Sequence, residues 1–161
     1  MAHSFDLAAA FLEAHPAEAA RVLESLPTYE ACEFFVLVEP ARGAGALSSM
    51  LPTAGARVLT HLPEPSAAAL AAAANTQSVV AILRHVPKAL RDRLIAAMPA
   101  AAAIAVQMLL GFPDDTVGAW TDSEIVAVPS TANVTAVLDQ LRAVPEAAIE
   151  QIFVVDSAQH L

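Results

Sequence analysis

Four acidic side chains lie close together near the middle of the second half of the chain: Asp114, Asp115, Asp122 and Glu124. Divalent cations such as Mg²⁺ prefer oxygen ligands, and a hydrated Mg²⁺ needs only one or two carboxylates. Asp114 and Asp115 are therefore the candidate metal ligands of this sequence. The same residues also suit a turn that leads into a strand, because aspartate is common in turns. Both interpretations stay open.

The histidines and the cysteine show no spacing typical of a metal or catalytic site. Cys32 lies beside Phe34 and Phe35, which predicts a small buried thiol rather than a nucleophile. No two histidines stand at the close spacing of metal ligands, and three of them are expected at or near helix ends, where a cation suits the helix dipole. The histidines are His3, His15, His61, His85 and His160.

The serines and glycines also lack the surroundings of catalytic or phosphate-binding loops. Ser48, Ser49 and Ser123 have no flanking glycines of a nucleophile elbow. Gly43 and Gly45 do not stand between a strand and a helix, as the glycines of a phosphate loop do. We therefore predict that the chain is not an enzyme and that it binds no cofactor tightly.

The net charge of −9 is unevenly distributed along the chain. Residues 1–40 contain seven acids and Arg21, residues 41–93 contain six basic residues and two acids, and residues 94–161 contain eight acids and Arg142. This balance argues against nucleic acid as a partner, because phosphate binding needs a cationic surface. One basic cluster predicts a solvated helix face or pairing with the acidic flanks. It comprises Arg84, Lys88, Arg91 and Arg93.

No segment has the composition of a membrane span. The longest apolar stretch, residues 96–112, is interrupted by Pro99 and Gln107 and is shorter than the roughly 20 apolar residues that a spanning helix needs. The N-terminus lacks the basic start and apolar run of a signal peptide, and a single cysteine fits a reducing cytosol. We expect this chain to be soluble.

The elements that would position these residues are marked by a regular series of prolines. Eight of them recur at intervals of about 12 residues, except for one double interval in which Asn75 stands where the missing proline would fall. They are Pro16, Pro27, Pro40, Pro52, Pro63, Pro87, Pro99 and Pro113. Because proline disfavours helix in the residue before it and cannot donate an N–H, this spacing allows only short helices. A fixed period of this kind is typical of stacked-repeat proteins.

Pairs of apolar residues recur five and four positions before most of the prolines, and we expect them to form one continuous core. The pairs are Val22-Leu23, Phe35-Val36, Val58-Leu59, Ile82-Leu83, Leu94-Ile95 and Met108-Leu109. The pattern predicts nine helices, near residues 4–14, 17–26, 29–38, 42–50, 53–61, 65–74, 77–86, 88–97 and 100–110. Thr28, Thr53 and Thr76 are the expected caps. Helices this short must rest on their neighbours.

The pattern changes after Phe112. The run from Pro113 to Thr116 predicts a turn. Residues 125–128 are typical of a buried strand, residues 131–144 alternate as a helix, and residues 152–155 are typical of a second strand, so this part predicts a parallel β-α-β unit. Such a unit normally needs further strands and a covering helix. We therefore expect the sequence, which stops at Leu161, to be part of a longer protein.

Two stretches after Phe112 resemble the domain junction of MgtE-type magnesium transporters. The run Phe-Pro-Asp-Asp-Thr-Val-Gly-Ala-Trp at 112–120, followed by Ser-Glu-Ile-Val-Ala-Val at 123–128, is similar to the family's entrance into a CBS domain. The run Ile-Phe-Val-Val-Asp at 152–156 is similar to a later strand of that domain. The proline-spaced helices upstream resemble the family's cytosolic N domain, a right-handed superhelix of short helices.

The resemblance implies a mainly α protein: a right-handed superhelical stack with a repeat of about 12 residues over 1–112, then a junction and a truncated CBS domain over 113–161. It implies a cytosolic regulatory and docking region of a divalent-cation (magnesium) transporter, which couples domain arrangement to gating at the cytoplasmic face of the inner membrane. The implied partners are the CBS and transmembrane domains of the full-length protein, with dimerisation through CBS domains, and magnesium is the implied ion. The alternative is a helical interaction scaffold without ion sensing, similar to the flagellar motor switch protein FliG.

The sequence departs from the family pattern where the family carries acidic magnesium ligands in its helical domain. The aligned positions are the helix around Ala46 and the segment from Thr76 to Val80, and neither contains a carboxylate. At the junction, Trp120-Thr121-Asp122 replaces the family's Leu-Met-Thr. Magnesium sensing through the helical stack is therefore not expected of this chain.

Overall fold

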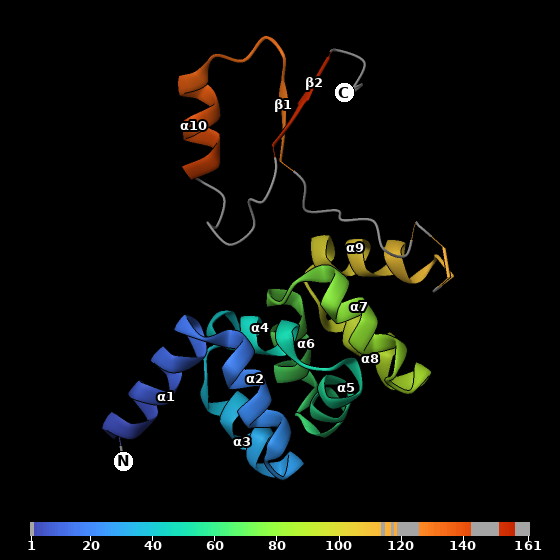
Figure 1. Ribbon diagram of the computed structural model, residues 1–161. Coiled ribbons are helices and arrows are strands. Elements are labelled where there is room, and N and C mark those ends of the chain that lie inside the picture. Colours follow the sequence, from blue (N-terminus) through green and yellow to red (C-terminus); the bar gives the residue numbers. More distant parts are fainter. Residues whose placement is uncertain (1, 114, 117, 119–125, 143–151, 157–161) are drawn as a thin grey trace. The chain divides into compact units, whose positions relative to one another are not determined.

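The computed structural model describes residues 2–113, 115, 116, 118, 126–142 and 152–156 (Figure 1). The chain divides into two compact units, Met1–Thr121 and Asp122–Leu161, and each is considered by itself. The described part of the first unit is helical, and the described part of the second combines one helix with two strands. This mainly α architecture agrees with the sequence prediction.

The first unit is built from short helices that follow one another almost without a break. Within the described residues they are α1 (Ala2–Ala14), α2 (Pro16–Ser25), α3 (Thr28–Leu37), α4 (Pro40–Ser49), α5 (Pro52–His61), α6 (Glu64–Ala73), α7 (Thr76–Arg84), α8 (Lys88–Ala97) and α9 (Ala100–Leu110). Each helix predicted for this unit is present, and the observed bounds differ from the predicted ones by at most two residues at either end.

Proline marks the helix starts in two ways. In one group proline is the first helical residue, whose N–H has no partner within the helix. In the other group it directly precedes the helix. The first group is Pro16, Pro40 and Pro52, and the second is Pro27, Pro63, Pro87 and Pro99.

The prediction that threonines cap these helices was wrong. Thr28 and Thr76 are themselves the first residues of α3 and α7, and Thr53 is the second residue of α5. The residue before α3 is Pro27, which has no side-chain oxygen to accept a capping hydrogen bond. The chain therefore starts most of these helices by the fixed backbone of proline and by packing, rather than by side-chain caps.

Asn75 shows why one proline of the series is missing. Its Oδ1 accepts a hydrogen bond from the Ser78 backbone N–H at 3.1 Å, which caps α7. Its own backbone N–H donates to Ser48 Oγ at 2.9 Å, and the Ser48 hydroxyl donates in turn to the Ala44 carbonyl at 2.9 Å. Proline has no N–H and could not make the link to α4.

We predict that Asn75→Ala lowers the free energy of unfolding by about 1 kcal/mol, because the N-terminus of α7 loses its capping side chain. Asn75→Asp keeps an accepting oxygen and is the matched control, expected to stay within about 0.5 kcal/mol of the parent. Urea denaturation followed by circular dichroism measures both. If the aspartate variant were as unstable as the alanine variant, the cap would not be the reason for Asn75.

The helices pack in two rows, because each helix lies beside the helix two further along the chain. The contacts run α2–α4–α6–α8 in one row and α3–α5–α7–α9 in the other, while α1 packs against α2 and α4 (Figure 1). A pair of helices, about 24 residues, is thus the structural repeat. Two side-chain interactions join residues a little more than one such repeat apart: Glu24 Oε1 accepts from the Leu51 N–H, 27 residues on, and Glu64 pairs with Arg93, 29 residues on.

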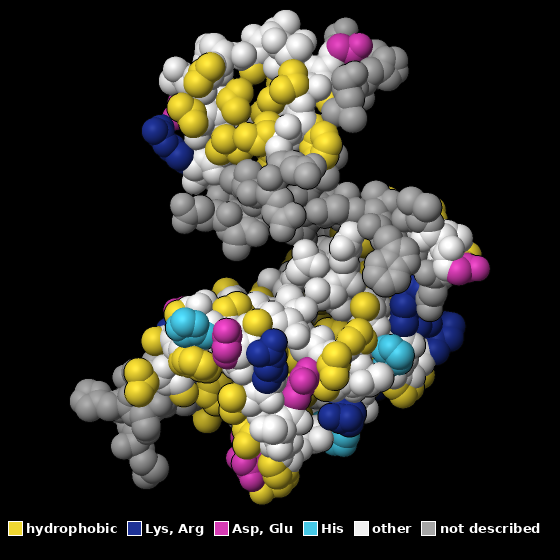
Figure 2. Space-filling view, viewed as in Figure 1, with side chains coloured by type: hydrophobic (Ala, Val, Ile, Leu, Met, Phe, Trp, Pro, Cys, Tyr) yellow, Lys and Arg dark blue, Asp and Glu magenta, His cyan; other side chains and the backbone are white. Residues whose placement is uncertain are grey.

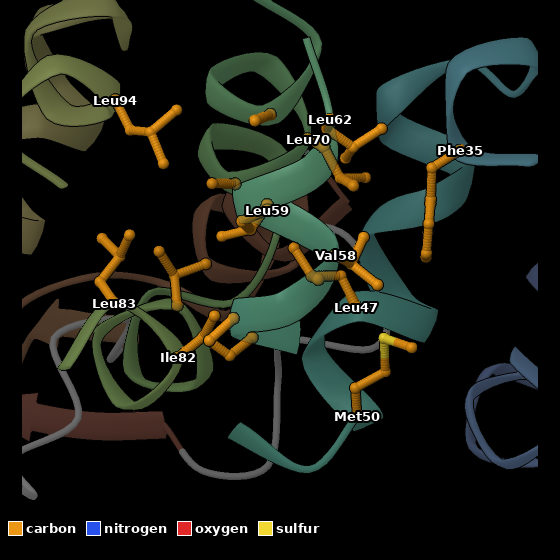
Figure 3. Close-up of a cluster of buried hydrophobic side chains, with 14 of the residues drawn as sticks. Phe35, Leu47, Met50, Val58, Leu59, Leu62, Leu70, Ile82, Leu83 and Leu94 are labelled. Carbon is orange, nitrogen blue, oxygen red and sulfur yellow. The ribbon is translucent and has the colours of Figure 1, made fainter. Parts of the chain in front are cut away.

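Two series of buried core positions recur along the stack, each with a period of about 12 residues. In the central helices α5, α7 and α8, both members of the apolar pairs are buried, as predicted. Figure 3 shows Leu59, Leu83 and Leu94 pointing into one cluster together with side chains of α3, α4 and α6. One series of buried residues is Leu23, Phe35, Leu47, Leu59, Ala71, Leu83 and Ile95, and the other is Ala46, Val58, Leu70, Ile82, Leu94 and Val106.

The expectation that every apolar pair lies wholly in the core was wrong towards the ends of the stack. Val22 and Met108 are each 54% exposed, and Val36 is 49% exposed, while their partners Leu23, Leu109 and Phe35 are buried. Helices towards the ends have fewer neighbours to cover them, so only one residue of the pair finds a partner. The helices α2, α3 and α9 therefore carry apolar side chains on their surface.

A second repeating pattern, which the sequence reasoning missed, lets the helices approach closely. In α2 to α7 a pair of small or slender buried residues lies about one helical turn before the large buried ones. These small pairs are Ala19-Ala20, Ala31-Cys32, Gly43-Ala44, Gly55-Ala56, Ala67-Ala68 and Val79-Val80. A Cβ on Gly55 would lie only 2.7 Å from Ile82 Cδ1, and a Cβ on Gly43 only 3.1 Å from Leu70 Cδ1. Small residues on one helix thus leave space for large side chains of the second helix after it in the chain.

The second unit contains a parallel β-α-β unit in its described part. Its elements are β1 (Val126–Pro129), α10 (Val134–Arg142) and β2 (Ile152–Val155). The two strands pair in parallel with Val126 opposite Ile152 and Pro129 opposite Val155. The order strand, helix, strand agrees with the prediction, and a parallel pair requires such a crossover connection.

Candidate functional site

The predicted metal ligands follow the last helix of the stack and lie only partly within the described residues. Asp115 is exposed, whereas Asp114, Asp122 and Glu124 lie outside the described residues. The Thr116 N–H and hydroxyl both donate to the Pro113 carbonyl, at 3.1 and 2.7 Å, and close the turn that the sequence predicted. Among the residues that the structure describes, no group of three His, Cys, Asp or Glu side chains is placed to hold a metal ion.

The two places where the resemblance implies acidic ligands have other uses in this chain. Ala46 is fully buried in the core, so a carboxylate there would have to lose its hydration. In the segment from Thr76 to Val80, the Ser78 N–H donates to the Asn75 side-chain oxygen, and Val79 and Val80 are buried in the core. Both positions therefore serve packing and capping, which agrees with the absence of carboxylates from the sequence there.

The basic cluster is mostly paired within the stack. Lys88 Nζ lies 2.6 Å from Asp92 Oδ2, and Arg93 Nε lies 2.9 Å from Glu64 Oε2. Arg84 donates to the carbonyls of Leu109 and Phe112 at the end of α9, at 3.3 and 3.1 Å. The prediction was that paired cations would find their partners in the acidic flanks. The two acidic partners, Asp92 and Glu64, instead come from the central region, residues 41–93. On the face of the first unit shown in Figure 2, acidic, basic and hydrophobic side chains are interspersed.

The N-terminal acidic region, residues 1–40, contributes an ion pair, which joins α1 and α4. Arg42 contacts both carboxylate oxygens of Glu13, at 2.5 and 3.1 Å. The hydrogen bond from Arg42 and the charge of its guanidinium hold the pKa of the Glu13 carboxyl below its ordinary value. Lys88 lowers the pKa of Asp92 in the same way, by its hydrogen bond and then its charge. Both pairs are solvent-exposed, and such pairs contribute little to stability.

Arg91 and Asp92 end the pattern of small pairs in α8. They occupy the positions at which the six preceding helices carry their small pair. A hollow of about 390 Å³ lies beside them, between α8 and α9, with Lys88 and Gln107 also in its wall. In a repeat protein the terminal repeats need a polar outer face for solubility. These charges are therefore suited to closing one row of the stack.

Cys32 and the histidines take the structural places predicted for them. The Cys32 thiol is buried and donates to the Val58 carbonyl across α3 and α5 at 3.6 Å, and burial raises its pKa. A thiol with a raised pKa is a poor nucleophile. His15 precedes α2, His61 is the last residue of α5 and His85 follows α7, while the His61 ring bonds to the Arg57 carbonyl through Nδ1 at 2.8 Å.

The structure adds one feature that the sequence reasoning did not find, a groove between α3 and α5. Its volume is about 560 Å³. Its exposed apolar wall comes from α3, where Tyr29, Val36 and Leu37 lie on one side of the helix. A usable signal in the sequence was the presence of large apolar residues at positions that are small or polar in α2 and in α4 to α8.

Comparison with known proteins identifies the relatives of this chain. Residues 14–115 match the family model of the MgtE intracellular N domain. A crystal structure of the cytosolic domain of the Mg²⁺ channel MgtE in complex with ATP shares 25% sequence identity, with a TM-score of 0.76 over 91% of this chain and 61% of that chain. A crystal structure of the soluble part of a magnesium transporter shares 20% identity, with a TM-score of 0.58 over 100% of this chain and 70% of that chain.

This chain thus spans about three fifths of the length of the first of these structures. No curated protein matches the sequence. None of the described helices combines the length and the apolar character that a membrane crossing requires.

Proposed function

Because the family model covers residues 14–115, this chain belongs to the MgtE intracellular N domain family, and we propose that it is the cytosolic regulatory region of a magnesium transporter. The observation that carries the proposal is the match of both sequence and fold to the cytosolic domain of an Mg²⁺ channel. In the first unit the described residues form short helices packed against one another. A role in positioning other domains suits this structure.

In the proposed mechanism the helical stack acts as one body that docks against other domains of the full-length protein. The β1-α10-β2 unit is proposed as the start of a CBS domain, so that residues 1–112 form the N domain and residues 113–161 the junction and the partial CBS domain. Displacement of the stack would then be coupled to the gate of a transmembrane pore. A continuous apolar core from α2 to α9 supports this, because a stack packed in this way moves as a unit.

The test uses the complete reading frame, reconstituted in liposomes that contain a magnesium indicator. Removal of residues 1–112 is expected to leave magnesium flux through the pore intact. It is expected to abolish the change in this flux that follows a change in the magnesium concentration on the cytosolic side. The matched control is the full-length protein with Arg91→Ala, a surface change in the stack. Regulation that persists without residues 1–112 would contradict the proposal.

A second candidate function is a helical interaction scaffold without ion sensing, similar to FliG. Two observations favour it: the places of the family's acidic ligands are taken by Ala46 and by the uncharged segment from Thr76 to Val80, and α3 carries an exposed apolar wall. The two functions differ in the flux experiment, because a scaffold without ion sensing would leave the magnesium response of the pore unchanged on deletion.

Asp114 and Asp115 are the residues that we propose as magnesium ligands of this chain. We predict that millimolar Mg²⁺ barely raises the melting temperature of residues 1–161, because the stack offers neutral oxygens where carboxylates would be needed. A site held at a hundred times its dissociation constant would add about 2.7 kcal/mol. Melting scans with tenfold steps of Mg²⁺ at constant ionic strength measure this. A rise of several degrees that Asp114→Asn with Asp115→Asn abolishes would show that the acidic cluster is a real site.

A further inference from the structure

The residues that line the groove between α3 and α5 can be compared with the residues at equivalent positions of the other helices. Because the period of the repeat is about 12 residues, each residue of α3 has equivalents in the neighbouring helices. Tyr29 corresponds to Ala17, Ala41, Thr53, Pro65, Gln77 and Ala89. Val36 corresponds to Glu24, Ser48, Thr60, Ala72, Arg84 and Ala96, and Leu37 to Ser25, Ser49, His61, Ala73, His85 and Ala97. In α9 the equivalents are Ala101, Met108 and Leu109, so among α2 to α9 only α3 places a large apolar side chain at all three positions.

A second groove, three helices further along, shows the same geometry with a different lining. It lies at α6 and α8 and has a volume of about 540 Å³. Its residues Pro65, Ala69, Ala72, Ala73 and Ala97 correspond to Tyr29, Glu33, Val36, Leu37 and His61 of the first groove. The backbone of the stack therefore produces this groove repeatedly, and the side chains of α3 distinguish one copy of it.

The apolar residues of the α3 groove are only partly covered by the fold of the unit itself. Tyr29 is 64% exposed and Leu37 is 68% exposed, although the core lies directly behind them at Cys32. Large apolar side chains that gather at exposed positions mark interaction sites more often than scattered ones do. Positions 29, 33, 36 and 37 fall on one stripe of a helix, so a partner helix lying along α3 would contact all of them.

The charges around the groove select the partner. Glu33 lines the groove, and Glu30 accepts a hydrogen bond from the Tyr29 hydroxyl at 2.8 Å. No lysine or arginine is among the described residues that line it, and residues 1–40 carry seven acids against Arg21. Like charges disfavour a second copy of the same face and an anionic lipid surface, whereas opposite charges favour association. A cationic partner is therefore the best match.

We propose that the groove formed by Tyr29, Val36, Leu37 and Glu33 on α3, with His61 of α5, is the docking site for a basic amphipathic helix of a partner protein. Apolar side chains of the partner, spaced three to four residues apart, fill the groove. Its lysines or arginines face Glu30 and Glu33. This inference goes beyond the proposed regulatory role and does not depend on a magnesium response.

The test measures binding of a defined peptide to the whole chain. The peptide is an acetylated and amidated amphipathic helix of leucine and lysine, about four turns long, titrated by calorimetry at physiological ionic strength. We expect Leu37→Asp to weaken its binding by at least about tenfold. Ala73→Asp, the same charge at the equivalent position of the α6 groove, is expected to change binding by less than about twofold, and circular dichroism confirms that both variants are folded.

Two further peptides and two further measurements decide between the possible occupants. A scrambled peptide of the same composition and a leucine–glutamate peptide of reversed charge are both expected to bind weakly. Equal loss of binding in the Leu37→Asp and Ala73→Asp variants, or equal binding of the scrambled peptide, would overturn the proposal, because the attraction would then be diffuse. Two other results would also overturn the proposal. One is that the protein alone dimerises in sedimentation velocity and Leu37→Asp abolishes the dimer. The other is that the protein binds phosphatidylserine vesicles and Leu37→Asp abolishes that binding.

Discussion

Leu59→Ala is expected to lower the free energy of unfolding by about 2–5 kcal/mol, the range for removing a fully buried leucine side chain from a tight core. Leu59 is completely buried in α5, between the helices of both rows (Figure 3). Its neighbours are held by the close approach of α5 and α7, so they cannot collapse freely into the space left behind. A loss of this size is a large part of the stability of a small domain.

Urea denaturation measures this loss, and two variants serve as references. Leu83→Ala changes the equivalent buried position two helices further on, in α7, and is expected to show a loss of similar size. Leu37→Ala removes the same atoms from a leucine that is mostly exposed, so a change of about 0.5 kcal/mol or less is expected. If Leu59→Ala and Leu37→Ala cost the same, the assigned register of the repeat would be wrong.

Gly55→Leu is expected to destabilise the stack by about 1–3 kcal/mol or more, because there is no space for a side chain between α5 and α7. A Cβ alone would lie 2.7 Å from Ile82 Cδ1 and 2.9 Å from Ile82 Cγ1. Ile82 is buried, so turning its side chain aside would disturb the packing of the core around it. Glycine in a helix interior is otherwise unfavourable, and replacing it improves helix propensity by up to about 1 kcal/mol. Destabilisation despite this gain would therefore report the close contact.

A double-mutant cycle gives this prediction its control. Combined with Ile82→Ala, which removes the opposing atoms, Gly55→Leu should cost less than it does alone, and the difference is the coupling energy. Ala69→Leu, at an exposed position of α6, is expected to be nearly neutral. Thermal and urea unfolding of the parent, the two single variants and the double variant measure the cycle. A Gly55→Leu protein as stable as the parent would show that α5 and α7 do not approach as closely as described.

The candidate site was predicted less completely than the fold. The turn from Pro113 to Thr116 and the burial of Cys32 followed from local sequence and are confirmed. The proposed role of Asp114 and Asp115 stays a prediction. The groove on α3 was not predicted, because it depends on which positions of each helix remain uncovered, and no sequence period states this directly.

The amino-acid sequence by itself determined the helices and their ends. Proline acts on its own backbone and on the residue before it, so a series of prolines divides the chain without reference to any distant part. The alternation of apolar residues in the last part likewise indicated the β-α-β order. Both signals are local, and both helices and strands appear close to the predicted residues.

Only the tertiary structure decided which faces of these helices became core, because burial depends on neighbours that come from elsewhere in the chain. Val58 and Val22 hold equivalent positions in the repeat, yet Val58 is buried in the middle of the stack while Val22 is exposed towards its end. Asn75 uses its N–H because Ser48 of α4 lies beside it, 27 residues away in the sequence. A residue's place within its helix follows from the local period, but its partner is set by the helix that packs two places along.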